Sequence, residues 1–272
     1  NQQTWTSTEL SVFDFLMTGS IGNIDIASGL QFRDESFDVA RGASSIAQFD
    51  AAGNITQPAD LLFLGGGLES TASRNATALF IEGSMNPSDR LEVKGALRYE
   101  DLESDSSVDP KIAFRYQASD ELALRASFST SFREASLAQL TSTNISLQGI
   151  QDYNADGSAK GGTAFIRIAQ ANNPNLAPEE SENMNIGAMW NPTDKLSMKL
   201  DYWAIDYTNV ITIESAQGKV AATPFDSDVK RTAGGTLTGV TTKYFNAANV
   251  NTSGLDFEST YDFDTSFGQA QV

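Results

Sequence analysis

The stretch "DPKIAFRYQASDELALRASFSTSFR", residues 109–133, alternates apolar and polar side chains on both sides of one short turn. Ile112 and Phe114 alternate with polar neighbours before the turn, and Leu122 and Leu124 do so after it. A period of two is typical of β-strands that have one apolar and one polar face. The stretch therefore predicts two neighbouring strands joined by the tight turn "ASDE".

The same alternation recurs along most of the chain, and no stretch has the pattern of a long amphipathic helix. Further strands are expected near residues 8–18, 24–33, 76–86, 91–100, 181–190, 195–208, 241–249 and 253–263. The sequence thus predicts an all-β fold, an antiparallel meander of about ten strands.

The connections between these strands alternate between short and long. Short turns are expected at residues 19–23, 86–90, 118–121 and 191–195. Long connections are expected near 38–71, 133–180 and 209–240, with one modest connection at 103–109. Outer-membrane barrels keep tight turns at one rim and long external loops at the other, whereas a sandwich has no reason to do so. The spacing favours such a barrel, and a soluble or surface-attached β-sandwich that binds carbohydrate is the alternative.

Composition excludes several classes of function. The 272 residues carry a formal charge of -17, from 35 acidic and 18 basic residues, which argues against nucleic acid as a partner. The same excess disfavours a strongly anionic ligand unless a basic patch is hidden inside. Cysteine and histidine are absent, which removes disulfides, the usual catalytic triads and most zinc sites. We expect neither an enzyme nor a cofactor.

The charged faces of the strands have a specific meaning in a barrel. No apolar run approaches the length of a membrane-spanning helix, but a strand crosses with about 9–11 residues, alternate ones apolar. Because Arg or Lys facing lipid at mid-depth costs about 2–4 kcal/mol, charged residues must face the interior. The predicted lumen-facing residues are Glu82, Glu92, Lys94, Arg98, Arg115 and Arg125. Lys199 and Glu258 are expected on the same concave face.

The opposite, convex face is expected to contact lipid. Its predicted members are Ile26, Leu30, Leu79, Ile81, Val93, Leu97, Ile112, Phe114, Leu122, Leu124, Ile186, Leu200 and Phe257. Aromatic residues near strand ends suit the interfacial girdle of a barrel. The girdle candidates are Tyr99, Tyr116, Trp190 and Tyr202.

One segment partly matches a calcium-binding loop. In "DYNADG", Asp152, Asn154 and Asp156 offer oxygen ligands and Gly157 allows a sharp turn, but Thr163 replaces the bidentate Glu at position twelve. Asx-turn chemistry in a surface loop explains the same residues. Both interpretations stay open.

Four segments in order carry a family resemblance: "LEVKGALRYEDL" (91–102), "DPKIAFRYQASDELALRASFSTSFREASLAQL" (109–140), "NPNLAPEESENMNIGAMWNPTDKLSMKLDYWAIDYTNVI" (173–211) and "NTSGLDFESTYDF" (251–263). They resemble the β-barrel of TonB-dependent outer-membrane receptors. The resemblance implies a 22-stranded transmembrane barrel in the outer membrane, closed by a plug domain. It also implies energy-coupled uptake of a nutrient such as an iron chelate, vitamin, carbohydrate or peptide.

The chain departs from the family pattern in several places. Ala135 stands where the family usually has Pro after "FR", and we expect the plug domain and the energy-coupling box of the family to be missing before residue 1. The end of the chain also lacks the aromatic residue expected of a last barrel strand. We therefore expect residues 1–272 to be a partial barrel. Its expected partners are the lipid bilayer, its own plug, an inner-membrane energy-coupling protein reached through the missing N-terminal part, and the nutrient.

Overall fold

The computed structural model describes residues 3–57, 65–102 and 105–272. Its largest part is a ten-stranded sheet, here called the wall. In spatial order the wall contains β1 (Thr4–Ile21), β2 (Ile24–Arg41), β6 (Ser70–Ser88), β7 (Leu91–Leu102), β8 (Asp105–Gln117), β9 (Leu122–Arg133), β12 (Glu179–Thr193), β13 (Leu196–Thr208), β17 (Val250–Thr265) and β18 (Gly268–Gln271).

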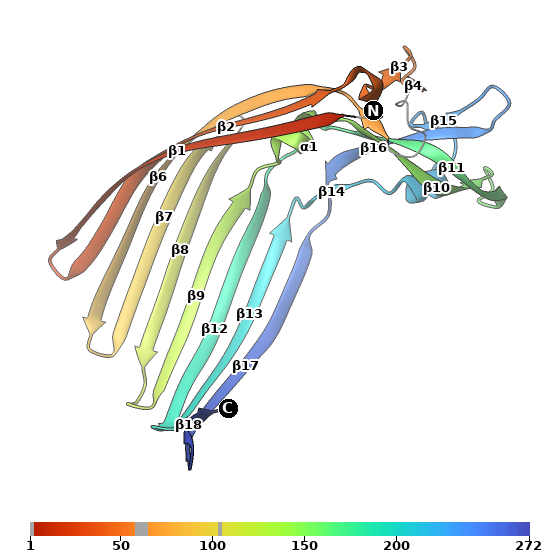
Figure 1. Cartoon of the computed structure of the whole chain (residues 1–272). Helices are drawn as coiled ribbons and strands as arrows, with labels where there is room; N and C mark the ends of the chain where they lie inside the picture. The colour runs from red at the N-terminus through yellow and green to blue at the C-terminus, as the bar shows by residue number, and fades with distance from the viewer. Residues whose placement is uncertain (1–2, 58–64, 103–104) are drawn as a thin grey trace.

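Neighbouring wall strands pair antiparallel throughout, so the predicted meander is confirmed. The wall curves, and its hairpin turns lie at the end away from the N-terminus (Figure 1). The long connections run over residues 42–69, 134–178 and 209–249, near the ranges expected from the sequence. Residues 58–64 of the predicted loop 38–71 lie outside the described residues.

The long connections meet at the other end of the wall and fold into a second unit, here called the cap (Figure 1). Its main sheet has the order β14-β16-β11-β10-β5, and β15 pairs with β16. The elements in these connections are η1 (Ala43–Ser45), β3 (Gln48–Phe49), β4 (Ile55–Gln57), β5 (Gly66–Gly67), α1 (Leu137–Thr141), β10 (Asn144–Tyr153), β11 (Ala159–Ala171), β14 (Ile211–Ile213), α2 (Ala216–Ala222), β15 (Val229–Arg231) and β16 (Leu237–Asn246).

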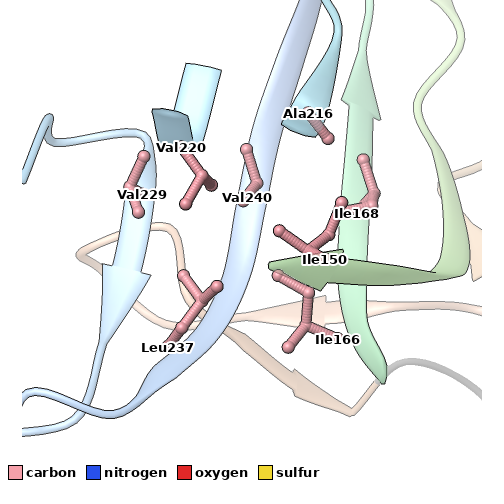
Figure 2. Packing of buried hydrophobic residues seen from close by; sticks show 8 residues of the cluster. All are labelled: Ile150, Ile166, Ile168, Ala216, Val220, Val229, Leu237 and Val240. Carbon is pink, nitrogen blue, oxygen red and sulfur yellow. The ribbon is translucent and has the colours of Figure 1, made fainter. Parts of the chain in front are cut away.

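The cap has its own hydrophobic core. Ile166 and Ile168 lie on either side of the half-buried Arg167 on β11 and point to one face of the sheet, where they pack in one cluster with Ala216 and Val220 of α2. Figure 2 shows the converging side chains of the cluster: Ile150, Ile166, Ile168, Ala216, Val220, Val229, Leu237 and Val240. Fully burying one such side chain contributes about 1.5–3 kcal/mol, so the cluster can hold distant segments together.

The opposite face of the cap sheet is covered in part by residues 46–55. Ala47 packs there with Ile145 and Ala169, and Phe49 and Ile55 pack against these three. Segments from all the long connections therefore build one packed unit. The sequence pattern predicts loops in these connections and does not predict this unit.

Two expectations about strands are corrected. The strand expected near 241–249 is β16, which lies in the cap and pairs parallel with β11, outside the wall meander. Residues 105–109 of the expected connection 103–109 belong to β8, and residues 103–104 lie outside the described residues. The β7–β8 ladder continues through polar residues because its hydrogen bonds come from the backbone, which the side-chain pattern does not report.

Helices contribute little to this fold. Among the described residues, α1 and α2 have five and seven residues, and none of the helices could span a membrane.

Candidate functional site

The wall has one apolar face. Residues opposite one another in an antiparallel ladder share a face, and the register runs from Leu30 to Leu79, from Leu79 to Tyr99, and onward to Phe257. All thirteen residues predicted for the apolar face lie on it, as do the girdle candidates. Nine of the thirteen side chains are exposed, among them Leu79 at 53%, Ile186 at 54% and Phe257 at 63%, and the other four are half-buried.

This exposure decides between the two folds considered. In a soluble β-sandwich the apolar face of the sheet would pack into a dry core. The wall instead presents a contiguous band of large apolar side chains, far beyond the scattered apolar residues of an ordinary surface. The sandwich alternative does not fit, and the apolar face requires a hydrophobic environment around it.

The opposite face of the wall is polar. The register places Glu82, Glu92, Lys94, Arg98, Arg115 and Arg125 on it. Lys199 and Glu258 lie opposite each other on the same face and form an ion pair at 3.2 Å. The role of these residues in lining a lumen stays a prediction.

The predicted polar residues do not form one cluster. Lys94 pairs with Glu92 at 2.9 Å, and Arg115 donates to the side chain of Gln117 at 3.0 Å on its own strand. Arg125 reaches farther and pairs with Asp201 of β13. Their chemistry is that of a wetted, charged surface, without a nucleophile and base in contact.

A tighter network near the cap was missed from the sequence. Glu100 is only 2% exposed and forms ion pairs with both Arg33 and Arg98. Arg98 also donates to the side-chain oxygen of Gln31 at 2.8 Å. A buried carboxylate is tolerated only when cations compensate it, so these residues depend on one another. The period-two pattern that identified Arg98 applies equally to Glu100 and could have found it.

A hollow of about 740 Å³ lies on the polar face, nearer the hairpin turns. Its floor consists of small side chains, including Ala27, Ala96 and Ala113. Glu82 and Lys94 stand at its sides, so the structure brings two of the predicted lumen-facing residues together here. A hollow with small side chains at its floor and charged side chains around them can be filled by a polar protein surface or by water.

The segment of residues 134–143, here called the clasp, crosses from the end of β9 to β2 and β6 and includes α1. Arg74 of β6 fastens it: its guanidinium binds Glu35 at 2.7 Å, donates to the carbonyl of Ala135 at 2.7 Å and pairs with Glu134 at 3.3 Å. Burial raises the pKa of the Glu134 carboxyl. The clasp narrows the space beside the polar face, because Arg74 and Glu35 lie on that face.

The calcium candidates are separated by their contacts. Asp152 accepts two hydrogen bonds from Arg231, at 2.9 and 2.5 Å, and this contact lowers the pKa of its carboxyl. Asp156 accepts from the backbone and hydroxyl of Ser158, and Asn154 donates to the same hydroxyl. Over the described ranges, no group of three or more acidic residues is arranged to hold a metal ion. Calcium binding stays a prediction.

A curved antiparallel wall with an exposed apolar face and a charged opposite face is typical of part of an outer-membrane β-barrel. The sequence matches the family described as TonB dependent receptor-like, beta-barrel over residues 1–271. The chain belongs to this family, which is one of outer-membrane transport receptors and not of enzymes. No curated protein matches the sequence.

Solved structures with a similar fold include siderophore receptors. A mutant of the ferric enterobactin receptor PfeA from Pseudomonas aeruginosa, in complex with enterobactin, is 17% identical with a TM-score of 0.64; the match covers 96% of this chain and 34% of the receptor. The siderophore receptor PirA from Acinetobacter baumannii is 16% identical with a TM-score of 0.65, and the match covers 96% of this chain and 35% of that receptor. The copper transporter OprC is 12% identical with a TM-score of 0.58, and the match covers 96% of this chain and 35% of the transporter.

The matched chain thus spans about a third of the length of these receptors. At such low identity the likeness concerns the fold.

Proposed function

We propose that this chain forms about ten strands of the wall of a 22-stranded outer-membrane receptor that takes up a nutrient by energy-coupled transport. The apolar face contacts lipid, and the polar face borders a lumen filled by water and a plug domain. Binding and translocation, without bond chemistry, are the proposed activity. An inner-membrane energy-coupling protein and the plug are the proposed partners.

The observation that carries the proposal is that no Arg or Lys of the described wall strands lies on the apolar face. Leu124 and Arg125 are neighbours in β9, yet one belongs to the exposed apolar band and the other pairs with Asp201 on the polar face. Lipid cannot solvate an ionic group at mid-depth, whereas a wet lumen can. A shift of the register by one residue would exchange the faces, so the pattern is under strong physical constraint.

The proposal covers several classes of nutrient. Receptors named for ferric enterobactin, siderophores and copper share the fold, and these names support uptake of a metal or its chelate. Vitamins, carbohydrates and peptides stay admissible, because in such receptors the loops and the plug choose the solute.

The test exploits the adjacent pair in β9. In the full-length protein, Leu124→Arg should block assembly into the outer membrane, because an arginine facing lipid costs about 2–4 kcal/mol at mid-depth. Arg125→Leu changes the polar face and should assemble with a much smaller loss. Assembly is measured as the heat-modifiable, urea-resistant fraction in isolated outer membranes.

Equal assembly of the two variants would contradict the lipid-facing assignment. A wild-type protein that stays monodisperse without detergent would also contradict it and would favour a surface-attached binding module. Uptake that persists after the inner-membrane proton gradient is collapsed would indicate a passive pore.

A further inference from the structure

The cap contains two cations on either side of a glycine. Gly239 of β16 pairs with Arg167 of β11 on one side and with Lys230 of β15 on the other. Residues paired across neighbouring strands point to the same face, so the two basic side chains flank a position that has no side chain. A β-carbon on Gly239 would lie 3.9 Å from that of Lys230, which confirms that Lys230 is on this side.

A loop forms the roof of this gap. Lys230 donates to the carbonyl of Ala52 at 3.0 Å, across 178 positions of sequence. The loop keeps its shape because Asp50 accepts hydrogen bonds from the backbone of Ala52 and from the backbone and side chain of Asn54. The pocket between them has a volume of about 120 Å³. Its lining includes Asn54, Arg167, Lys230, Thr238, Gly239 and Thr241.

The positive charge in this pocket is incompletely compensated. Within the described part of the chain, the Arg167 guanidinium takes part in no hydrogen bond or ion pair, although the residue is half-buried. Two acids lie near Lys230: Asp50, whose carboxylate is bound by the roof loop, and Asp228, which Lys219 engages at 2.8 Å. By contrast, Arg231 on the same strand is neutralised by Asp152 at 2.5 Å.

We propose that this pocket binds a small oxyanion group, a carboxylate, phosphate or sulfate, carried by a solute. A guanidinium presents a fork of donors that matches two oxygens of such a group, and the lysine adds a point charge. The hydroxyl of Thr241 supplies a further donor at the wall of the pocket. In a chain with 35 acidic residues, a site that favours anions is selective because most of the surface repels them.

The size of the pocket restricts the ligand. A volume of about 120 Å³ admits a four- or five-atom oxyanion and excludes a whole siderophore or oligosaccharide, so only the charged end of a larger solute would enter. The cap lies at the end of the wall opposite the hairpin turns (Figure 1). The group is therefore expected from a soluble compound. Binding here does not require transport, so its test is separate from the assembly test.

Isothermal titration calorimetry of the full-length protein in detergent tests the proposal, with sodium sulfate and inorganic phosphate as probes. Ionic strength is held constant with sodium chloride, so that general charge screening does not change. Wild-type protein should show saturable binding of at least one probe. Arg167→Gln and Lys230→Gln should each weaken it about tenfold or more, because each removes a charge-assisted contact.

Lys160→Gln is the matched control. It removes the same charge from the same cap, but Lys160 does not line the pocket and donates to the carbonyl of Gly235. Its effect should stay below about twofold. Arg167→Lys keeps the charge and loses the fork, and should give an intermediate loss even if Arg167→Gln does not fold.

Absence of saturable binding to wild-type protein would overturn the site. Unchanged affinity in both Arg167 variants, or an equal loss in Lys160→Gln, would overturn it as well.

Discussion

Arg125 and Asp201 form a bidentate ion pair across an intervening strand. Arg125 lies on β9 and Asp201 on β13, with Gly187 of β12 directly between them in the ladder. Nε donates to Oδ1 at 2.9 Å and Nη2 to Oδ2 at 2.5 Å. The pair passes over the glycine, where a side chain would block it, so three strands are joined on the polar face by one contact.

Gly187→Ala should break this pair. A β-carbon at residue 187 would lie 1.9 Å from Oδ1 of Asp201, too close for both atoms to stay in place. We expect a loss of about 1–3 kcal/mol in stability, measured as a lower urea concentration for unfolding of the assembled protein. Gly95→Ala in β7 is the control, because a β-carbon there meets nothing within 4 Å. A similar midpoint for both variants would contradict the close approach.

Gly254→Ala should displace the ring of Trp203. The indole of Trp203 covers Gly254 of the neighbouring strand, and an added β-carbon would lie 2.6 Å from the ring. The ring must move, so the tryptophan emission spectrum should shift. Gly83→Ala, whose β-carbon would have only an ordinary contact at 3.5 Å, should leave the spectrum unchanged. A spectrum insensitive to both changes would show that the ring is not held there.

Arg74→Gln should release the clasp. Arg74 binds Glu35, Glu134 and the carbonyl of Ala135. Each hydrogen bond to a charged group contributes about 1.5–3 kcal/mol to stability, and the substitution removes this contribution. Limited proteolysis should then cut within residues 134–143 several times faster. Arg115→Gln removes an equal charge from the same face but breaks only a contact to Gln117. It should not change the cleavage rate, and equal rates in the two variants would refute the fastening role.

The cap should loosen in acid through Asp152. The hydrogen bonds from Arg231 hold the pKa of this carboxyl below its usual value. A lowered folded-state pKa stabilises the fold above the unfolded pKa, and this contribution is lost as the pH falls through the folded-state pKa. Protection of residues 150–168 from hydrogen exchange, corrected for intrinsic rates, should therefore fall below about pH 4.

Asp152→Asn should remove most of that pH dependence and lower protection already at neutral pH, by about 1–3 kcal/mol. Asp156→Asn is the matched control, because among the described residues the carboxylate of Asp156 forms hydrogen bonds within its own turn, chiefly to Ser158. Equal loss in both variants would point to a general effect of charge on the hairpin.

The wall was largely predictable because one physical rule repeats along it. Each strand must present alternate residues to lipid, so the faces of Leu124 and Arg125 can be assigned from their own strand alone. The same rule places Glu100 on the polar face together with Arg98, although Glu100 is not among the predicted lumen-facing residues. The ends of strands were less predictable: β8 begins at Asp105, inside a stretch read as a connection, since backbone pairing tolerates polar side chains there.

The cap could not be predicted from local patterns. Its core joins Ile150 of the connection 134–178 to Val220 and Val240 of the connection 209–249, and its pocket joins a loop near residue 53 to strands that include Arg167 and Gly239. Short apolar runs such as "FIRIA" signal burial but do not say against which partner. Contacts between distant segments depend on how the wall brings their ends together.

The sequence by itself determined the strand period, the separation of apolar from charged faces and the alternation of short turns with long connections. These features are local, because lipid imposes the same requirement on every crossing strand. Only the tertiary structure decided which charges meet, such as Arg125 with Asp201 over Gly187, and that the long connections pack against one another in the cap. Those outcomes depend on register and on packing between segments far apart in the chain, which side-chain alternation alone does not encode.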